Sequence, residues 1–249
     1  MSTTAPNILV TGGSRGIGRA ICEQLYKKGC NVIFTYRSSQ AAAEELIASL
    51  QALGQPNRVA AYQCDMASME AVTELFKTLK KDFGQLDGLV NNAGQLGETK
   101  PFMFANDEGW FETLRHNVAC VTNSCKRVLP LMIRKKQGRI LNITSIAARL
   151  GNPGQSAYAA SKAAIVAFSK SLFREISAFG ITVNCLSPGL VATDMTSNLN
   201  KRYVDEILKT PLGRFARPDE VASVAAFLMT DAPDYLLGQD VVLDGGLGV

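Results

Sequence analysis

The stretch that decides the fold reads Ile8-Leu9-Val10-Thr11-Gly12-Gly13-Ser14-Arg15-Gly16-Ile17-Gly18. The apolar residues at 8–11 predict a buried strand, and a helix is expected from residue 16 to about residue 28. The glycines at 12, 16 and 18 let the backbone turn sharply and approach a ligand closely. The helix start then offers free N–H groups to a phosphate. Because the spacing is G-x-x-x-G-x-G and not the G-x-G-x-x-G fingerprint, an ordinary strand–turn–helix is the alternative at this point.

The rest of the chain alternates short apolar runs with longer segments of helical period. This alternation favours a parallel α/β sheet with helices on both faces, because continuous apolar strands are typical of sheets buried on both sides. Strands are predicted at 31–36, 58–63, 86–90, 139–144, 182–187 and 240–243, and helices at 40–53, 68–83, about 107–136, about 157–179 and 218–229.

The chain shows no linker, repeat or low-complexity tract, so we expect one domain over residues 1–249. Its dinucleotide-binding half would span about 1–140, and its catalytic and substrate-binding half about 141–249. The periodicity is weakest at 190–217, which indicates a mobile lid or a substrate loop.

The composition argues against several classes of protein. The 249 residues are 47% hydrophobic, yet no apolar stretch approaches the roughly 20 residues that span a bilayer. The net charge of +4 is small and scattered, which argues against nucleic acid as a partner. No secretion signal is predicted, so the six cysteines are expected to be free thiols in a reducing cytoplasm. The single histidine makes a His-rich metal site impossible, and no metal is predicted.

The end of the second predicted strand indicates which dinucleotide would fit. An NAD site usually has an acidic residue there that binds the ribose 2′-hydroxyl, but this chain reads Thr35-Tyr36-Arg37-Ser38. Arg37, helped by Arg15, could bind a 2′-phosphate, because a guanidinium matches a phosphate in geometry and charge. We therefore predict NADPH/NADP as the cofactor; the alternative is that Arg37 is merely solvated.

A second group of residues has the chemistry of a carbonyl reductase. Tyr158 and Lys162 are four residues apart on one helix face, and a nearby cation favours ionisation of a phenol whose ordinary pKa is near 10. The tyrosine could then donate a proton to a carbonyl oxygen, while Ser145 donates a hydrogen bond to the same oxygen. Ser145 follows a strand at the carboxyl edge of the sheet, where such folds bind ligands. Asn117 could face the same crevice.

Together these residues closely resemble the classical short-chain dehydrogenase/reductase family. The resemblance covers essentially the whole chain, in order, and implies a Rossmann-like doubly wound parallel seven-stranded sheet. It implies that Lys162 bonds the nicotinamide ribose, that Asn117 supports a proton relay through water and that Asp65 contacts the adenine. The motifs are Thr11-Gly12-Gly13-Ser14-Arg15-Gly16-Ile17-Gly18, Asn91-Asn92-Ala93-Gly94, Asn117, Ser145, Tyr158-x-x-x-Lys162 and Pro188-Gly189.

The resemblance also implies which residues line the cofactor, with Val191 and Thr193 beside the nicotinamide. The expected cofactor-binding set is Gly12, Ser14, Arg15, Gly16, Ile17, Gly18, Arg37, Asp65, Met66, Asn91, Ala93, Gly94, Tyr158, Lys162, Pro188, Gly189, Val191 and Thr193.

Within the family, the chain is most similar to bacterial 3-oxoacyl-(acyl-carrier-protein) reductases, through residues 151–162, 168–172, 180–184 and 193–196. This likeness implies NADPH-dependent reduction of a 3-oxoacyl thioester, with acyl carrier protein as a possible partner, in fatty-acid or polyketide/polyene-type synthesis. It also implies a homotetramer built on the helices at 107–133 and 157–179.

Residues 95–101 and Phe179 depart from the usual form of that group, and both border the expected substrate mouth. The alternatives are a dehydrogenase acting on a free alcohol, sugar or ketone and, against the intact catalytic residues, a non-catalytic nucleotide-binding scaffold.

Two further features have competing interpretations. Arg134, Lys135, Lys136 and Arg139 form a basic cluster that could dock an acidic carrier by electrostatic steering. The same cations could simply complement the negative end of a helix, which we favour slightly. His116 precedes Asn117 and points to another helix face, so a structural role is predicted for it.

Overall fold

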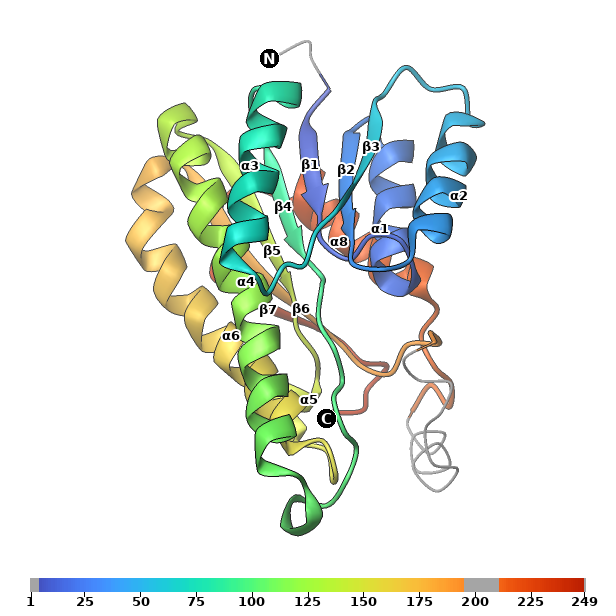
Figure 1. Ribbon diagram of the computed structural model, residues 1–249, viewed down its shortest axis with the longest axis vertical. Coiled ribbons are helices and arrows are strands. Elements are labelled where there is room, and N and C mark those ends of the chain that lie inside the picture. Colours follow the sequence, from blue (N-terminus) through green and yellow to red (C-terminus); the bar gives the residue numbers. More distant parts are fainter. Residues whose placement is uncertain (1–4, 195–210, 249) are drawn as a thin grey trace.

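The computed structural model describes residues 5–194 and 211–248. Strands and helices alternate through these residues, as Figure 1 shows. The strands are β1 (Asn7–Val10), β2 (Asn31–Tyr36), β3 (Val59–Gln63), β4 (Gly88–Asn91), β5 (Gly138–Ile143), β6 (Ile181–Pro188) and β7 (Asp240–Leu243). The helices are α1 (Gly16–Lys27), α2 (Gln40–Gln51), α3 (Met69–Phe83), α4 (Asp107–Lys135), α5 (Ala147–Leu150), α6 (Ser156–Ile176) and α8 (Pro218–Thr230), with 3₁₀ turns at Phe102–Phe104 and Ser177–Phe179.

The strands form one seven-stranded sheet in the order β3-β2-β1-β4-β5-β6-β7, and every neighbouring pair is parallel. The predicted doubly wound parallel sheet is therefore confirmed. The order reverses between β1 and β4, where such sheets open a crevice at their carboxyl ends. This single sheet contains strands from both predicted halves of the chain, about 1–140 and about 141–249.

Two hydrophobic cores lie on the two faces of the sheet. Helices α1, α2 and α8 cover one face, and α3, α4 and α6 cover the other (Figure 1). Both β1 and β4 are buried along their whole length, because side chains alternate between the faces: Ile8 and Val10 enter one core, and Leu9 the other. Each such aliphatic side chain contributes about 1.5–3 kcal/mol by leaving water.

The helix boundaries follow local signals that the sequence carries. Ser68 caps α3, where its hydroxyl accepts a hydrogen bond from the backbone N–H of Ala71 (3.2 Å). Asn106 caps α4 by accepting from Gly109 N–H (3.0 Å). At the far end of α4, Lys136 takes the left-handed conformation (φ 55°) that terminates the helix.

Some predicted boundaries were wrong. The helix predicted to run to residue 179 ends at Ile176, where a 3₁₀ turn begins. The strand predicted at 86–90 begins at Gly88. The short helix α5 was missed, because one turn is too short to show a period.

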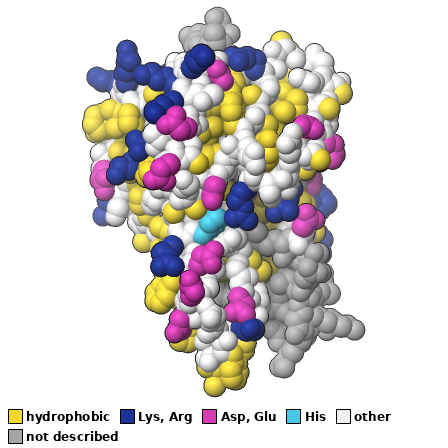
Figure 2. Space-filling model, viewed as in Figure 1, with side chains coloured by type: hydrophobic (Ala, Val, Ile, Leu, Met, Phe, Trp, Pro, Cys, Tyr) yellow, Lys and Arg dark blue, Asp and Glu magenta, His cyan; other side chains and the backbone are white. Residues whose placement is uncertain are grey.

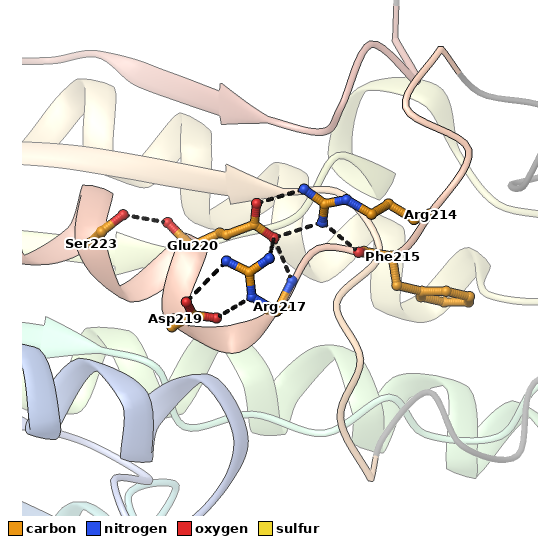
Figure 3. A network of polar contacts seen from close by, with 6 residues as sticks. All are labelled: Arg214, Phe215, Arg217, Asp219, Glu220 and Ser223. Carbon is orange, nitrogen blue, oxygen red and sulfur yellow. Dashed lines mark hydrogen bonds and ion pairs between the residues drawn. The ribbon is translucent and has the colours of Figure 1, made fainter.

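The loop predicted at 190–217 is described only at its two ends, and residues 195–210 lie outside the described part. The ends lie side by side: Ala192 N–H donates to Ala216 O (2.9 Å), and Ala216 N–H donates to Leu190 O (2.8 Å). Beyond this bridge, Arg214 binds both carboxylate oxygens of Glu220 on α8 (2.8 Å each), as Figure 3 shows. The bridge thus joins the two ends of the segment to each other, and the ion pair ties one of them to α8.

Candidate active site

The glycine turn after β1 is built by close backbone contacts. Gly12 has φ +65°, and a Cβ there would lie 3.1 Å from Ala93 Cα. A Cβ on Gly18 would overlap Gly12 O and come within 2.5 Å of Asn92 Nδ2. Only glycine therefore lets the start of α1 approach the turn and the segment after β4 so closely. The first residues of α1, Gly16, Ile17 and Gly18, line the cavity described below, where the sequence predicts an anion site.

Side chains from β1 and the segment after β4 tie this turn in place. Asn92 donates through Nδ2 to Thr11 O and Gly12 O, both at 3.0 Å. The hydroxyl of Thr11 accepts from the backbone N–H groups of Asn92 and Ala93, also at 3.0 Å. This support was missed in the sequence, because it depends on β1 pairing with β4, a strand some 80 residues away.

A cavity of about 420 Å³ lies over the turn. Its wall comes from the carboxyl ends of β1 to β4, one face of α4 and residues 193–194, so it occupies the predicted crevice. The predicted residues in its wall are Gly12, Ser14, Arg15, Gly16, Ile17, Gly18, Arg37, Asp65, Met66, Ala93, Gly94 and Thr193. The other lining residues are Thr35, Tyr36, Ser38, Ser39, Cys64, Asn92, Gln95, Leu96, His116, Cys120 and Asp194.

Six predicted cofactor residues lie outside that wall. Tyr158 and Lys162 are described below, and the other four are Asn91, Pro188, Gly189 and Val191. The Asn91 side chain is buried, donates to Asn142 Oδ1 (2.8 Å) and accepts from Ser124 Oγ (2.6 Å), so it serves the interior while Asn92 lines the cavity. Pro188 ends β6, and Gly189 packs against Asp244. Val191 is buried beside the Ala216 bridge.

Thr193, in contrast, reaches the glycine turn, because a Cβ on Gly16 would lie 3.5 Å from its methyl group.

Lys162 is the most unusual charged residue of the site. Its side chain is only 5% exposed, and Nζ donates a 2.9 Å hydrogen bond to Ile143 O at the end of β5. Burial lowers the pKa of Lys162 to about 8, and the neighbouring cysteines, chiefly Cys120, raise it only partly back. Nζ lies 5.6 Å from the centroid of the Tyr158 ring, so the predicted pair on α6 is adjacent.

Asn117 connects this pair to the cavity. Its amide closes a two-bond contact with the backbone of Gln95, accepting from N–H (2.8 Å) and donating to the carbonyl (2.9 Å). It also donates to Ser161 Oγ on α6 (3.0 Å). A Cβ on Gly94 would lie 3.2 Å from Asn117 Oδ1 and 3.7 Å from Lys162 Nζ. Gly94, which lines the cavity, therefore lies next to both groups.

Ser145 follows β5 at the carboxyl edge of the sheet, as predicted. Its hydroxyl accepts from Ala147 N–H (3.2 Å) in the turn that begins α5, and its own O–H remains available to a ligand. The next residue, Ile146, donates its N–H to Pro188 O (2.9 Å), so Ser145 lies beside the end of β6. Helix α5 in turn packs on α6, the helix that bears Tyr158 and Lys162.

His116 lines the cavity, which the sequence interpretation did not foresee. It lies on another face of α4 than Asn117, which faces α6, and the structural role predicted for it stays a prediction. All six cysteines are buried and form no disulfide, as expected for free thiols, and two of them, Cys64 and Cys120, also line the cavity.

The fold and site define a dinucleotide-binding α/β protein with a buried lysine and a tyrosine beside the nucleotide cavity. The chain belongs to the short-chain dehydrogenase/reductase family. A family model described as Enoyl-(Acyl carrier protein) reductase matches residues 12–248.

The relatives are reductases named for an acyl carrier. The chain is 40% identical to 3-oxoacyl-(acyl-carrier-protein) reductase of Synechocystis sp., covering 98% of this chain and 97% of that one. It is 41% identical to the enzyme of the same name from Haemophilus influenzae, covering 96% of each chain. The crystal structure of gox2181 matches with a TM-score of 0.92 at 31% identity, covering 98% of this chain and 95% of that one.

Proposed function

We propose that this protein reduces a 3-oxoacyl thioester to the 3-hydroxyacyl form with NADPH. The proposal rests on the position of Gly94, which lines the nucleotide cavity and lies next to the buried Lys162 and to Asn117. Two relatives near 40% identity over nearly the whole chain are named for this reaction. A non-catalytic scaffold would have no need to bury a lysine beside a tyrosine, since an unpaired buried cation is costly.

The residues divide the chemistry between them. NADPH, when bound in the cavity, supplies the hydride that reaches the carbonyl carbon. Tyr158 donates its phenolic proton to the carbonyl oxygen, and Ser145 donates a hydrogen bond to the same oxygen as negative charge develops there. The cation of Lys162 favours the phenolate that remains after the transfer. Asn117 supports the return of a proton through water, because its amide is fixed between Gln95 and α6.

The cavity fits a nucleotide that carries a 2′-phosphate. Arg37 is exposed at the end of β2 and lines the cavity together with Arg15. Ser38 and Ser39 lie in the same wall and offer further hydrogen-bond donors. No carboxylate stands at the end of β2 to bind a ribose 2′-hydroxyl in its place, which favours NADPH over NADH.

The basic cluster divides into two kinds of residue. Lys135 pairs with Asp87, and Arg139 pairs with Asp234 (2.8 Å) and donates to Leu228 O (3.3 Å). These two cations stabilise the protein itself. Arg134 and Lys136 are exposed and make no ion pair with a described residue. We propose that these two dock an acidic acyl carrier protein.

One observation favours the alternative of a free small-molecule substrate. Residues 95–101 are fixed in place: Asn117 holds Gln95, Gly97 packs tightly on Thr113, and Lys100 N–H donates to Gly154 O (3.0 Å). This segment departs from the usual reductase form, and Phe179 is 38% exposed where a basic residue is usual in the group. Such changes can alter the substrate mouth without touching the reacting groups.

The experiment presents one 3-oxoacyl group on acyl carrier protein, on coenzyme A and on a short thioester mimic, and measures initial NADPH oxidation. The proposal predicts a clear preference for the carrier-bound substrate in kcat/KM. Equal rates for all three, or no turnover beside rapid reduction of simple ketones, would make the protein a general carbonyl reductase.

A matched pair of variants tests the docking residues. Arg134 and Lys27 are both basic residues in the last turn of a helix, on opposite faces of the sheet. Arg134→Glu is expected to raise KM for the carrier-bound substrate about tenfold while leaving the mimic unchanged. Lys27→Glu makes the same charge change and should affect neither substrate; equal effects of the two variants would remove α4 as the dock.

We also propose the assembly and setting that the likeness implies. The protein would be one domain, form a homotetramer through α4 and α6, and act in the cytoplasm. Among the described residues, no helix is long and apolar enough to cross a membrane. Light scattering at micromolar concentration should give four times the chain mass, and a monomer would contradict the assembly.

A further inference from the structure

His116 is the only histidine of the chain, and the proposed chemistry does not use it. It is half-buried in the wall of the nucleotide cavity. Figure 2 shows the imidazole reaching the molecular surface among acidic and basic side chains. The charge of a titratable side chain in the cavity wall can act on a ligand that binds there.

The geometry of α4 places His116 on the side of the cavity away from the reacting groups. His116, Cys120 and Asn123 follow each other at i, i+4 and i+7, so they share one helix face. Asn123 donates through Nδ2 to Met66 O (3.1 Å) and Ala67 O (3.0 Å), which fixes this face against the segment after β3. Asn117 instead faces α6. The imidazole therefore borders the adenosine half of the cavity.

Charged groups from three elements act on the imidazole. Burial lowers the pKa of His116 below its usual value; Asp65, after β3, raises it in part, and Arg37, after β2, lowers it further. Glu112, one turn earlier on α4, has a smaller raising effect.

The two thiols of the wall do not contribute charge near neutrality. Burial raises the pKa of Cys64 to about 11 and that of Cys120 to about 12. Arg37 is thus a cation that opposes protonation of His116, and it is also the residue assigned to the 2′-phosphate.

On the basis of the proposed NADPH function, we propose that His116 is a cofactor-binding residue which takes up a proton from solvent when a nucleotide carrying a 2′-phosphate binds. A dianionic phosphate on Arg37 adds negative charge near the imidazole, which opposes the effect of that cation. The added charge favours the imidazolium. NAD lacks the phosphate and leaves His116 neutral. Discrimination between the two nucleotides therefore increases as the pH falls through the bound-state titration of His116.

Because the chain has one histidine, its imidazole signals in an NMR titration need no assignment. The titration is run on the free protein and with saturating NADP⁺ or NAD⁺. The pKa of His116 should rise by about one unit with NADP⁺ and by less than about 0.3 unit with NAD⁺. An equal shift with both nucleotides, or no rise with NADP⁺, would overturn the inference.

Calorimetric binding of NADP⁺ gives a second readout. A rise of one unit makes the protonated form bind about tenfold more tightly, so from pH 8 to pH 6 wild type should gain affinity relative to His116→Gln, by at most about tenfold. The ratio also removes the titration of the phosphate itself, which acts in the opposite direction. A ratio independent of pH would contradict the proposal.

Arg37→Gln provides the mechanistic control. It should raise the pKa of His116 in the free protein, because the opposing cation is removed, and it should weaken NADP⁺ binding more than NAD⁺ binding. If wild type binds no NADP⁺ at any pH, the proposed function itself fails. If NADP⁺ binds and the pKa of His116 does not move, only the inference about His116 fails.

Discussion

The nucleotide cavity and the catalytic group lie next to each other, but the chain builds them differently. The cavity depends on residues without a side chain: Gly12 and Gly18 allow close backbone contacts that any Cβ would prevent. The catalytic group consists of polar side chains, of which Lys162 and Asn117 are buried and fixed by hydrogen bonds to backbone groups. The first region depends on backbone shape and the second on particular functional groups. Substitutions should therefore damage binding in one region and turnover in the other.

The largest expected effect is on turnover. Tyr158→Phe removes the proton donor and leaves the cavity intact, so kcat should fall by about 10²–10⁴-fold while NADPH affinity changes little. Steady-state rates and nucleotide titration on the same preparation check both. Turnover within a few-fold of wild type would mean that Tyr158 is not the acid.

The converse case is Gly18→Ala, which places a methyl group against Gly12 O and Asn92. NADPH binding should be lost or greatly weakened, and stability should fall by about 1–3 kcal/mol as the turn is displaced. Fluorescence titration and urea unfolding measure the two effects. Gly109→Ala on α4 is the control, because its nearest neighbour would lie 3.8 Å away. If both variants behave alike, the close packing of the turn is not required.

A smaller effect, confined to nucleotide choice, is expected at the rim of the cavity. Arg37→Ala removes charge-assisted hydrogen bonds to the 2′-phosphate, so KM for NADPH should rise about 10–100-fold with KM for NADH nearly unchanged. Arg19→Ala serves as the control, because Arg19 binds Glu23 and Glu45 instead. Equal effects of Arg37→Ala on both nucleotides would remove it from the phosphate site.

The smallest effect is on stability, because burial of the Lys162 cation lowers the free energy of unfolding. Its folded-state pKa of about 8 lies below the unfolded value, so between these two values the unfolded chain holds more protons and stability rises with pH. Lys162→Met lacks this gain. Relative to wild type, its unfolding free energy should fall by about 1.5 kcal/mol from pH 8 to pH 9.5. Parallel pH profiles from urea unfolding would show that Lys162 is not desolvated.

The sequence predicted what depends on local pattern. The bounds of β2 and β7 were correct, and the glycines, Arg37, Ser145, Asn117 and the Tyr158–Lys162 pair were all identified as candidates.

What the sequence did not show depends on strands and helices that meet only in the folded chain. The support of the glycine turn by Asn92 requires β1 to pair with β4. The burial of Asn91 requires its partner Asn142 on β5. The place of His116 in the cavity wall requires α4 to pack against the segment after β3. None of these has a signature in the neighbouring residues, so periodicity could not predict them.

One measurement tests the central claim most directly. NADPH consumed and 3-hydroxyacyl product formed are followed in the same reaction, starting from a 3-oxoacyl thioester, with wild type and with Tyr158→Phe. Wild type is expected to form one 3-hydroxyacyl product for each NADPH oxidised, and Tyr158→Phe to bind NADPH without oxidising it. NADPH that binds to wild type without being oxidised, or is oxidised without 3-hydroxyacyl product, would contradict the central claim.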